Sequence, residues 1–291
     1  MVAQMSALPM ADDPGAYPLS AHGPNAVLEA DPADGRSHTS VAKALALLDA
    51  FDQAGEVRGI SELAKRVNLP KSTTHRLLTV LIERGYVEHR GERYCLSDRV
   101  FELGHLVDHC QPAGLRERAI PFMAELFVET GATIHLGVLK GSVKGSEVLY
   151  LDKIFGHDGS PVTTTIGARK PAYCTALGKA VLAYSKAPTV ESVLRGGLTR
   201  HTPYTLTQPG QLIASLQRVH AEGIATDFEE CQVGVTCLAV PLFAGVGGVP
   251  LGALSICTRA GSGDVRRFAA RLLRAGRALS WELNDPGRAG C

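Results

Sequence analysis

The chain has 291 residues, of which 45% are hydrophobic and 20% are charged, and its formal net charge is +1. This mixture is typical of a soluble globular protein, and the length suggests about two domains. Because the chain is nearly neutral, any case for nucleic-acid binding must come from the local arrangement of charge. No apolar run approaches the ~18 residues needed to cross a bilayer, which argues against a membrane role.

The seven cysteines bear on the compartment in which the chain works. Their number is odd and they show no CxxC spacing. The N-terminus lacks both the basic n-region and the continuous apolar h-region of a secretory signal. Together these features predict a reducing cytoplasm, with no structural metal or cofactor.

The first elements in chain order are a tail and a helix. Residues 1–36 are dominated by Ala, Pro, Gly, Asp and Ser. Such a segment has few large apolar groups to compensate for ordering entropy, so we expect a disordered tail. From residue 39 to 54 apolar side chains recur at helical spacing, which predicts a helix that packs on the next two.

The stretch from Ile60 to Val87 predicts two short helices joined by a tight turn. Ser61 is a plausible N-cap of the first helix, and Asn68, which tolerates the left-handed conformation, is expected to end it. Pro70 then opens the second helix. Its core-facing positions fall at i, i+3, i+4 and i+7 and are Thr74, Leu77, Leu78 and Leu81.

The outward face of the second helix is small, hydrogen-bonding and cationic, and no acidic residue lies between Glu62 and Glu83. Such a face suits a DNA major groove, because short hydroxyls let the backbone approach and Arg76 can reach a guanine edge. We predict that this face contacts DNA through Lys71, which would bind the phosphate backbone, and through Ser72, Thr73, His75 and Arg76, which would enter the groove. Thr79 is expected to be surface only.

Residues 86–96 alternate large and polar side chains around Arg90-Gly91, which predicts a short hairpin. After two such helices the hairpin would be a wing, with Arg90 and Arg93 touching phosphates or an adjacent minor groove. The alternative is a solvated turn with ordinary charges. The predicted winged helix-turn-helix spans residues 37–97.

Two further helices, at 97–106 and 114–130, are expected to connect this head to the rest of the chain, with a linker helix at 98–113. The apolar stripe of the first is consistent with a dimer contact or with packing on its own domain. From residue 132 the pattern is of strands, at 132–139, 147–155, 162–166, 224–228, 236–243 and 249–258, with helices at 175–185, 211–222 and 265–283. The predicted class is therefore α+β with two domains, the second spanning 114–285 with a largely antiparallel sheet, followed by a flexible C-terminus at 286–291.

Several separated motifs resemble the IclR family of bacterial transcription regulators over about residues 39–283. The head carries Ile-Ser-Glu-Leu-Ala (60–64), Leu-Pro-Lys-Ser-Thr-Thr-His-Arg-Leu-Leu (69–78) and Glu-Arg-Gly-Tyr-Val (83–87). The second domain carries His-Leu-Gly-Val-Leu (135–139), Tyr-Leu-Asp-Lys-Ile (150–154), Thr-Ala-Leu-Gly-Lys-Ala (175–180) and Gly-Val-Thr-Cys-Leu-Ala-Val-Pro (234–241). The ordered series is more specific than the two-helix match alone.

The resemblance implies a GAF-like effector-binding domain behind the DNA-binding head, working as a homodimer or a dimer of dimers on a palindromic double-stranded operator. It also implies a pocket for a small-molecule effector. The matching positions here are Gly167, Ala168, Ala172, Asp227, Cys237, Ser255 and Cys257. Backbone amides near Gly167 and Ala168, together with Ser255, could donate to a carboxylate or carbonyl, and Asp227 could accept from a ligand hydroxyl or hold neighbouring donors.

Each effector position also has a simpler interpretation. Asp227 could be an ordinary strand-end or cap residue, and a buried cysteine is usually a small hydrophobe. Two departures from the family pattern concern the ligand: Phe228 interrupts an acidic run, and Cys257 stands where serine is frequent. Loss of a hydroxyl and gain of an aromatic ring favour an aromatic or other hydrophobic carboxylic acid over a short keto acid.

Two other functions compete with a ligand-responsive regulator. An enzyme would need a nucleophile with a base, and the candidates are Cys174, Cys237 and Cys257 with His135, His157 or His201; their spacing supports no such site and fits no zinc signature. We therefore expect no enzyme. A thiol-based redox sensor is the stronger alternative, because the same three cysteines could approach one pocket, although a sensor thiol needs a lowered pKa and access.

Overall fold

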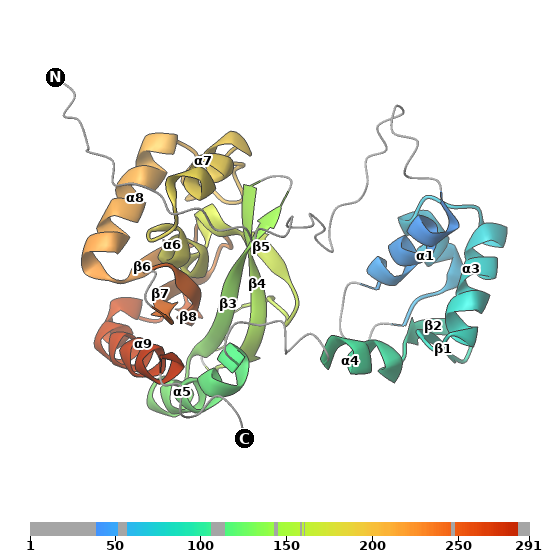
Figure 1. Cartoon of the computed structure of the whole chain (residues 1–291), viewed down its shortest axis with the longest axis horizontal. Helices are drawn as coiled ribbons and strands as arrows, with labels where there is room; N and C mark the ends of the chain where they lie inside the picture. The colour runs from blue at the N-terminus through green and yellow to red at the C-terminus, as the bar shows by residue number, and fades with distance from the viewer. Residues whose placement is uncertain are drawn as a thin grey trace.

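The computed structural model describes residues 39–51, 57–105, 114–142, 145–157, 159, 161–245 and 248–284. The predicted tail at 1–36, the second half of the predicted linker and the C-terminal segment at 286–291 lie outside these ranges. The described chain forms a small N-terminal head and a larger α+β unit (Figure 1). Within the described residues, no helix has the length and apolar character needed to span a membrane.

The head is a three-helix unit with a hairpin. Its elements are α1 (Ser40–Asp49), α2 (Ile60–Arg66), α3 (Lys71–Glu83), β1 (Val87–Arg90) and β2 (Arg93–Leu96). The two strands pair antiparallel, which confirms the predicted hairpin. Leu47, Leu63 and Leu78, one from each helix, are fully buried at the centre. Helical periodicity placed Leu63 and Leu78 there, but in the first helix it selected a face with Val41 and Leu45, which are 69% and 56% exposed, and missed Leu47. Helix α1 ends at Asp49, earlier than predicted.

Helix α2 follows the sequence prediction at its C-terminal end and departs from it at its N-terminal end. Asn68 has φ 51°, which confirms the left-handed residue that ends the first helix. Ser61 is not the N-cap, because α2 already begins at Ile60 with Gly59 as its cap. The physical reason lies one residue upstream, where Arg58 pairs with Tyr94 as an isolated bridge and the chain turns directly from that bridge into the helix.

Helix α4 (Asp98–His105) follows the hairpin, and α5 (Leu115–Thr130) opens the larger unit. The sheet of this unit is antiparallel throughout, with order β5-β4-β3-β8-β7-β6. Its strands are β3 (Thr133–Ser142), β4 (Gly145–Ile154), β5 (Arg169–Pro171), β6 (Ala225–Phe228), β7 (Val235–Phe243) and β8 (Pro250–Arg259). The remaining elements are η3 (Ala172–Cys174), α6 (Ala176–Leu182), α7 (Ala187–Arg195), α8 (Pro209–Glu222), η4 (Val265–Phe268) and α9 (Ala269–Leu283).

The two faces of the sheet have separate cores. On one face α5 and α9 pack against Ile134, Leu136 and Ile256, whose side chains are fully buried. On the other face α6 lies against β7 and β8, and α8 packs behind α6 (Figure 1). Because alternate residues of a strand point to opposite faces, this second face receives a different set of side chains, many of them small or polar.

One predicted strand is wrong. Residues 162–166 are irregular, and the short strand of this region is β5 at Arg169–Pro171 instead. Lys153 explains the difference, since its ammonium donates to the carbonyls of Val162 (3.3 Å) and Thr164 (2.8 Å), which are therefore satisfied without a strand partner. Helix α7 was not predicted.

Candidate functional site

The two faces of helix α3 differ in burial and in polarity. Thr74, Leu77, Leu78 and Leu81 are buried, as predicted. The hydroxyl of Thr74 is satisfied within the helix, donating to the Pro70 carbonyl at 3.1 Å. The opposite face places Lys71, Ser72, His75 and Arg76 in solvent and leaves Thr73 partly exposed. The head thus presents a continuous polar and cationic helix face that its own core does not use.

The hairpin holds the other two predicted DNA-contacting residues. Arg90 and Arg93 are direct partners in the β1–β2 register, so both lie at the tip. Arg90 lies 3.9 Å from Glu88 and Arg93 lies 3.7 Å from Glu62, and both arginine side chains are more than half exposed. Exposed pairs at such distances contribute little, so these guanidinium groups are readily available to another anion.

The sheet register gathers four predicted effector residues on the face covered by α6. In the β6–β7–β8 pairing Asp227 lies opposite Cys237, and Cys237 lies opposite Cys257. Directly opposed residues of antiparallel strands point to the same face. Ser255 lies two residues before Cys257, on the same face, opposite His135 of β3. Ala172, in η3, is fully buried in the same apolar cluster as the two cysteines.

Gly167 and Ala168 lie in the turn that precedes β5. The amide of Gly167 donates to the Tyr150 carbonyl at 2.8 Å, and the amide of Ala168 donates to the Thr165 carbonyl at 3.1 Å. Gly167 has φ +83°, the left-handed region that favours glycine in such a turn. The expectation that these two amides donate to a ligand therefore does not fit this structure, because both already have acceptors.

Asp227 has a visible structural role. Its side chain is almost completely buried, and Oδ1 accepts a hydrogen bond from the Glu230 amide at 2.7 Å. Burial raises the pKa of this carboxyl well above its usual value, against the opposing charge of Lys179. The capping interpretation of Asp227 agrees with this contact, because the carboxylate fixes the turn that follows β6.

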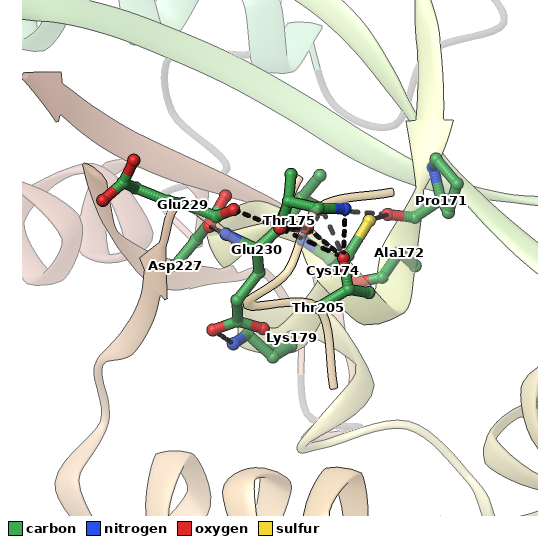
Figure 2. A network of polar contacts seen from close by, with 11 residues as sticks. Pro171, Ala172, Cys174, Thr175, Lys179, Thr205, Asp227, Glu229 and Glu230 are labelled. Carbon is green, nitrogen blue, oxygen red and sulfur yellow. Dashed lines mark hydrogen bonds and ion pairs between the residues drawn. The ribbon is translucent and has the colours of Figure 1, made fainter. Parts of the chain in front are cut away.

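A buried ion pair adjoins this turn and was not predicted. Lys179 of α6 is 1% exposed, and its ammonium lies 2.5 Å from Oε1 of Glu230 (Figure 2). The Glu230 carbonyl also accepts from the Thr205 hydroxyl at 2.7 Å. The signal available in the sequence was a lysine within an otherwise apolar helix, since a buried ammonium requires a partner. The pair fastens the loop after β6 to α6.

His135 and Cys257 form a contact that sequence spacing did not indicate. The two residues are 122 positions apart, yet His135 Nδ1 lies 3.5 Å from Cys257 Sγ. The other ring nitrogen of His135, Nε2, is buried and has no hydrogen-bond partner among the described residues. Hydrogen bonding to Cys237 is the main cause that lowers the pKa of Cys257 to about 5, with the charge and hydrogen bond of His135 acting in the same direction against burial.

The described residues contain no group of three or more His, Cys, Asp or Glu side chains suited to a metal ion. Two surface cavities, of about 300 and 270 Å³, lie outside the predicted effector face. One is formed around Leu182, Ile213 and His220, and the other around Tyr184 and Phe243. None of the predicted effector residues lines either cavity.

Comparison with known proteins assigns the chain to a protein family. The family model "Bacterial transcriptional regulator IclR C-terminal" matches residues 108–281, and the model "IclR helix-turn-helix domain" matches residues 40–91. The transcriptional regulator XynR of Escherichia coli is 34% identical over 253 residues, covering 85% of this chain and 98% of the relative. The Pca regulon regulatory protein of Pseudomonas putida is 30% identical over 251 residues, covering 84% of each chain.

Solved structures give the same result. The structure of an IclR homolog from Microbacterium hydrocarbonoxydans complexed with 4-hydroxybenzoate matches with a TM-score of 0.74 at 25% identity, covering 84% of this chain and 99% of that one. The IclR of Thermotoga maritima matches with a TM-score of 0.69 at 26% identity, with the same coverage. The chain therefore belongs to the IclR family of bacterial transcriptional regulators.

Proposed function

We propose that this regulator binds a palindromic operator through α3 and the wing, and that a small organic acid bound by the larger unit changes its affinity for DNA. The observation that carries the DNA part is the division of α3 into a buried apolar face and a free polar face. The proposed contacts are Lys71, Ser72, Thr73, His75 and Arg76 on the helix and Arg90 and Arg93 on the wing.

We test the DNA contact with Arg76→Ala. A good arginine contact to a base is worth about 1 to 3 kcal/mol, so affinity for the operator should fall about 5- to 150-fold. Footprinting and fluorescence anisotropy measure this change at one fixed salt concentration. The matched control is Arg84→Ala, an exposed arginine at the C-cap of α3. Normal binding and an unchanged footprint with Arg76→Ala would show that the groove face is placed wrongly.

The effector is proposed to lie on the sheet face covered by α6, near Gly167, Ala168, Ala172, Asp227, Cys237, Ser255 and Cys257. Support comes from the register that gathers the last four of these residues and from the unpaired Nε2 of His135. A buried polar atom without a partner costs about 1 to 3 kcal/mol, which a ligand with a polar group would recover.

We propose an aromatic or other hydrophobic carboxylic acid as the effector. A structural relative was solved in complex with 4-hydroxybenzoate, an aromatic carboxylic acid. Calorimetry with benzoate, 4-hydroxybenzoate and protocatechuate, set against glyoxylate and pyruvate, tests the class. Binding of only the two- or three-carbon acids would overturn it.

The proposed mechanism is linkage in an oligomer. The effector binds two arrangements of a dimer, or a dimer of dimers, with different affinity and so changes the separation of two recognition helices. A coupling of about 1 to 3 kcal/mol alters operator occupancy 5- to 150-fold. We propose the domain boundaries 37–97, 98–113 and 114–285 for this arrangement, a cytoplasmic location set by the DNA partner, and no enzymatic activity.

A further inference from the structure

Lys153 of β4 is a buried lysine whose ammonium has no carboxylate partner among the described residues. The residue is 8% exposed, and Nζ donates to the carbonyls of Val162 (3.3 Å) and Thr164 (2.8 Å). The ring of Phe155 lies 4.1 Å from Nζ and, like the carbonyls, has no net charge. Burial lowers the pKa of Lys153, against the charge of Cys257. An ammonium among neutral hydrogen-bond partners is costly in the interior and attracts an anion.

The sheet register places Lys153 beside His135. The two residues are direct partners in the β3–β4 pairing, and His135 is in turn the partner of Ser255 on β8. Directly opposed residues of antiparallel strands point to the same face, with Cβ atoms about 4.5 to 5.5 Å apart. The side chains of Lys153, His135 and Ser255 therefore form one row across the α6 face, next to the row that contains Cys257.

His135 has a buried ring nitrogen that lacks a partner. The residue is 1% exposed, and its ring is fixed by Cys257, whose Sγ lies 3.5 Å from Nδ1, and by the edge-to-face ring of Tyr150 at 5.2 Å. Nε2 has no hydrogen-bond partner in the described part of the chain. When Nδ1 accepts from the thiol, Nε2 carries the hydrogen, and in the imidazolium form both nitrogens carry one. His135 thus directs a buried donor that needs an acceptor.

We propose that Lys153 and His135 form the site that binds the carboxylate of the effector, with Lys153 Nζ and His135 Nε2 each donating to it. Neither residue was among the predicted effector positions. The amides of Gly167 and Ala168, which were expected to hold the carboxylate, already have acceptors. This inference rests on the proposed function in one respect, that the effector binds on the α6 face.

The proposal also gives the ligand an orientation. Asp227 lies on β6, at the far edge of the sheet, whereas His135 and Lys153 lie on β3 and β4. A carboxylate held by the cationic pair is therefore kept away from the carboxyl of Asp227. The uncharged part of the ligand then extends across Cys257 and Cys237 towards Asp227, which is free of the acid group and suits a ligand hydroxyl.

The test is calorimetry on the full-length protein with benzoate, 4-hydroxybenzoate, protocatechuate, glyoxylate and pyruvate, and with the neutral amide of the acid that binds most tightly. Loss of a hydrogen bond to a charged group should weaken binding of that acid about 10- to 150-fold in Lys153→Met and in His135→Phe. Binding of the amide should change by less than about 3-fold in Lys153→Met, because the amide has no charge for the ammonium to hold. His135→Gln retains an N–H donor and should bind the acid more tightly than His135→Phe.

The matched control is Lys140→Met, which makes the same change at an exposed lysine of β3 and should bind every ligand as wild type does. Circular dichroism checks that each variant is folded. If Lys153→Met were unfolded, the comparison of His135→Phe with His135→Gln would decide.

The outcomes separate this inference from the proposed function. Wild-type affinity for the acid in both Lys153→Met and His135→Phe would overturn the inference and leave the proposed effector class in place. Equal losses for acid and amide would also overturn it, because the residues would then only support the fold. Binding of glyoxylate or pyruvate alone, weakened by Lys153→Met, would refute the aromatic class and support this site. Failure of all five acids to bind the wild-type protein would overturn both.

Discussion

Replacing Lys179 by Met tests how the loop after β6 is held. Lys179 and Glu230 have side chains only 1% and 9% exposed, with their charged atoms 2.5 Å apart. Oε2 of Glu230 already has no partner among the described residues, so the substitution leaves both carboxylate oxygens buried without a partner. Breaking a buried pair in this way costs about 3 to 5 kcal/mol, because an uncompensated charge remains in the interior.

The expected loss is large enough to measure by thermal unfolding. In a domain of this size each kcal/mol shifts Tm by about 2 to 4 °C, so Lys179→Met should lower Tm by about 6 to 20 °C. Lys186→Met, at an exposed position outside any ion pair of the described residues, should stay within about 0.5 kcal/mol of wild type. The double variant Lys179→Met with Glu230→Leu should recover most of the loss, since no buried charge is left.

The loss of stability in Lys179→Met should also depend on pH. Burial is the main cause that raises the pKa of Glu230, and the charge of Lys179 opposes it. Without the ammonium the folded-state pKa of Glu230 rises further above its unfolded value. A carboxyl with a raised pKa contributes stability that is fully present below the unfolded value and is lost as pH rises. The Tm deficit of Lys179→Met should therefore be smaller at pH 5 than at pH 8. An unchanged Tm, or a double variant as unstable as the single one, would refute the reasoning.

Two further pairs of substitutions test a capping residue and a helical glycine, and thermal and urea unfolding measure the stability of all four variants. Asp227→Asn keeps an acceptor for the Glu230 amide and removes a carboxyl whose pKa is raised in the folded protein. Its stability should therefore match wild type near pH 4 and exceed it towards pH 8. Asp227→Ala, which removes the acceptor, should lose about 1 to 3 kcal/mol of stability. Gly178→Ala would place a Cβ 2.2 Å from the Ala172 carbonyl oxygen, so it should cost about 1 to 3 kcal/mol of stability although alanine is the better helix former. In the control Gly210→Ala the added Cβ meets nothing within 4 Å, so this variant should be neutral or slightly more stable than wild type.

The head was predictable because its determinants are local. Helical periodicity alone predicts which side chains of α3 are buried, and Asn68 indicates a left-handed residue in the turn after α2. The errors there are also local in kind: Ser61 has the right chemistry for a cap, but the bridge between Arg58 and Tyr94 starts the helix earlier. Such a bridge joins residues far apart in the sequence, and no propensity reports it.

Most strands of the sheet were predictable from the sequence, but which residues of neighbouring strands lie opposite one another was not. Alternation gives each strand two faces, yet only the register sets Cys237 opposite Cys257 and Ser255 opposite His135. The strand expected at 162–166 failed for the same reason, because a lysine from β4 satisfies its carbonyls in place of a neighbouring strand. Side-chain bonds of this kind depend on the folded arrangement.

By itself, the sequence determined the winged helix-turn-helix, the antiparallel α+β class and the family, because periodicity, turn residues and ordered motifs are properties of short stretches. Only the tertiary structure decided that Lys179 meets Glu230 and that His135 meets Cys257. These two contacts join residues 51 and 122 positions apart. Their chemistry follows from burial and distance, which chain folding alone creates.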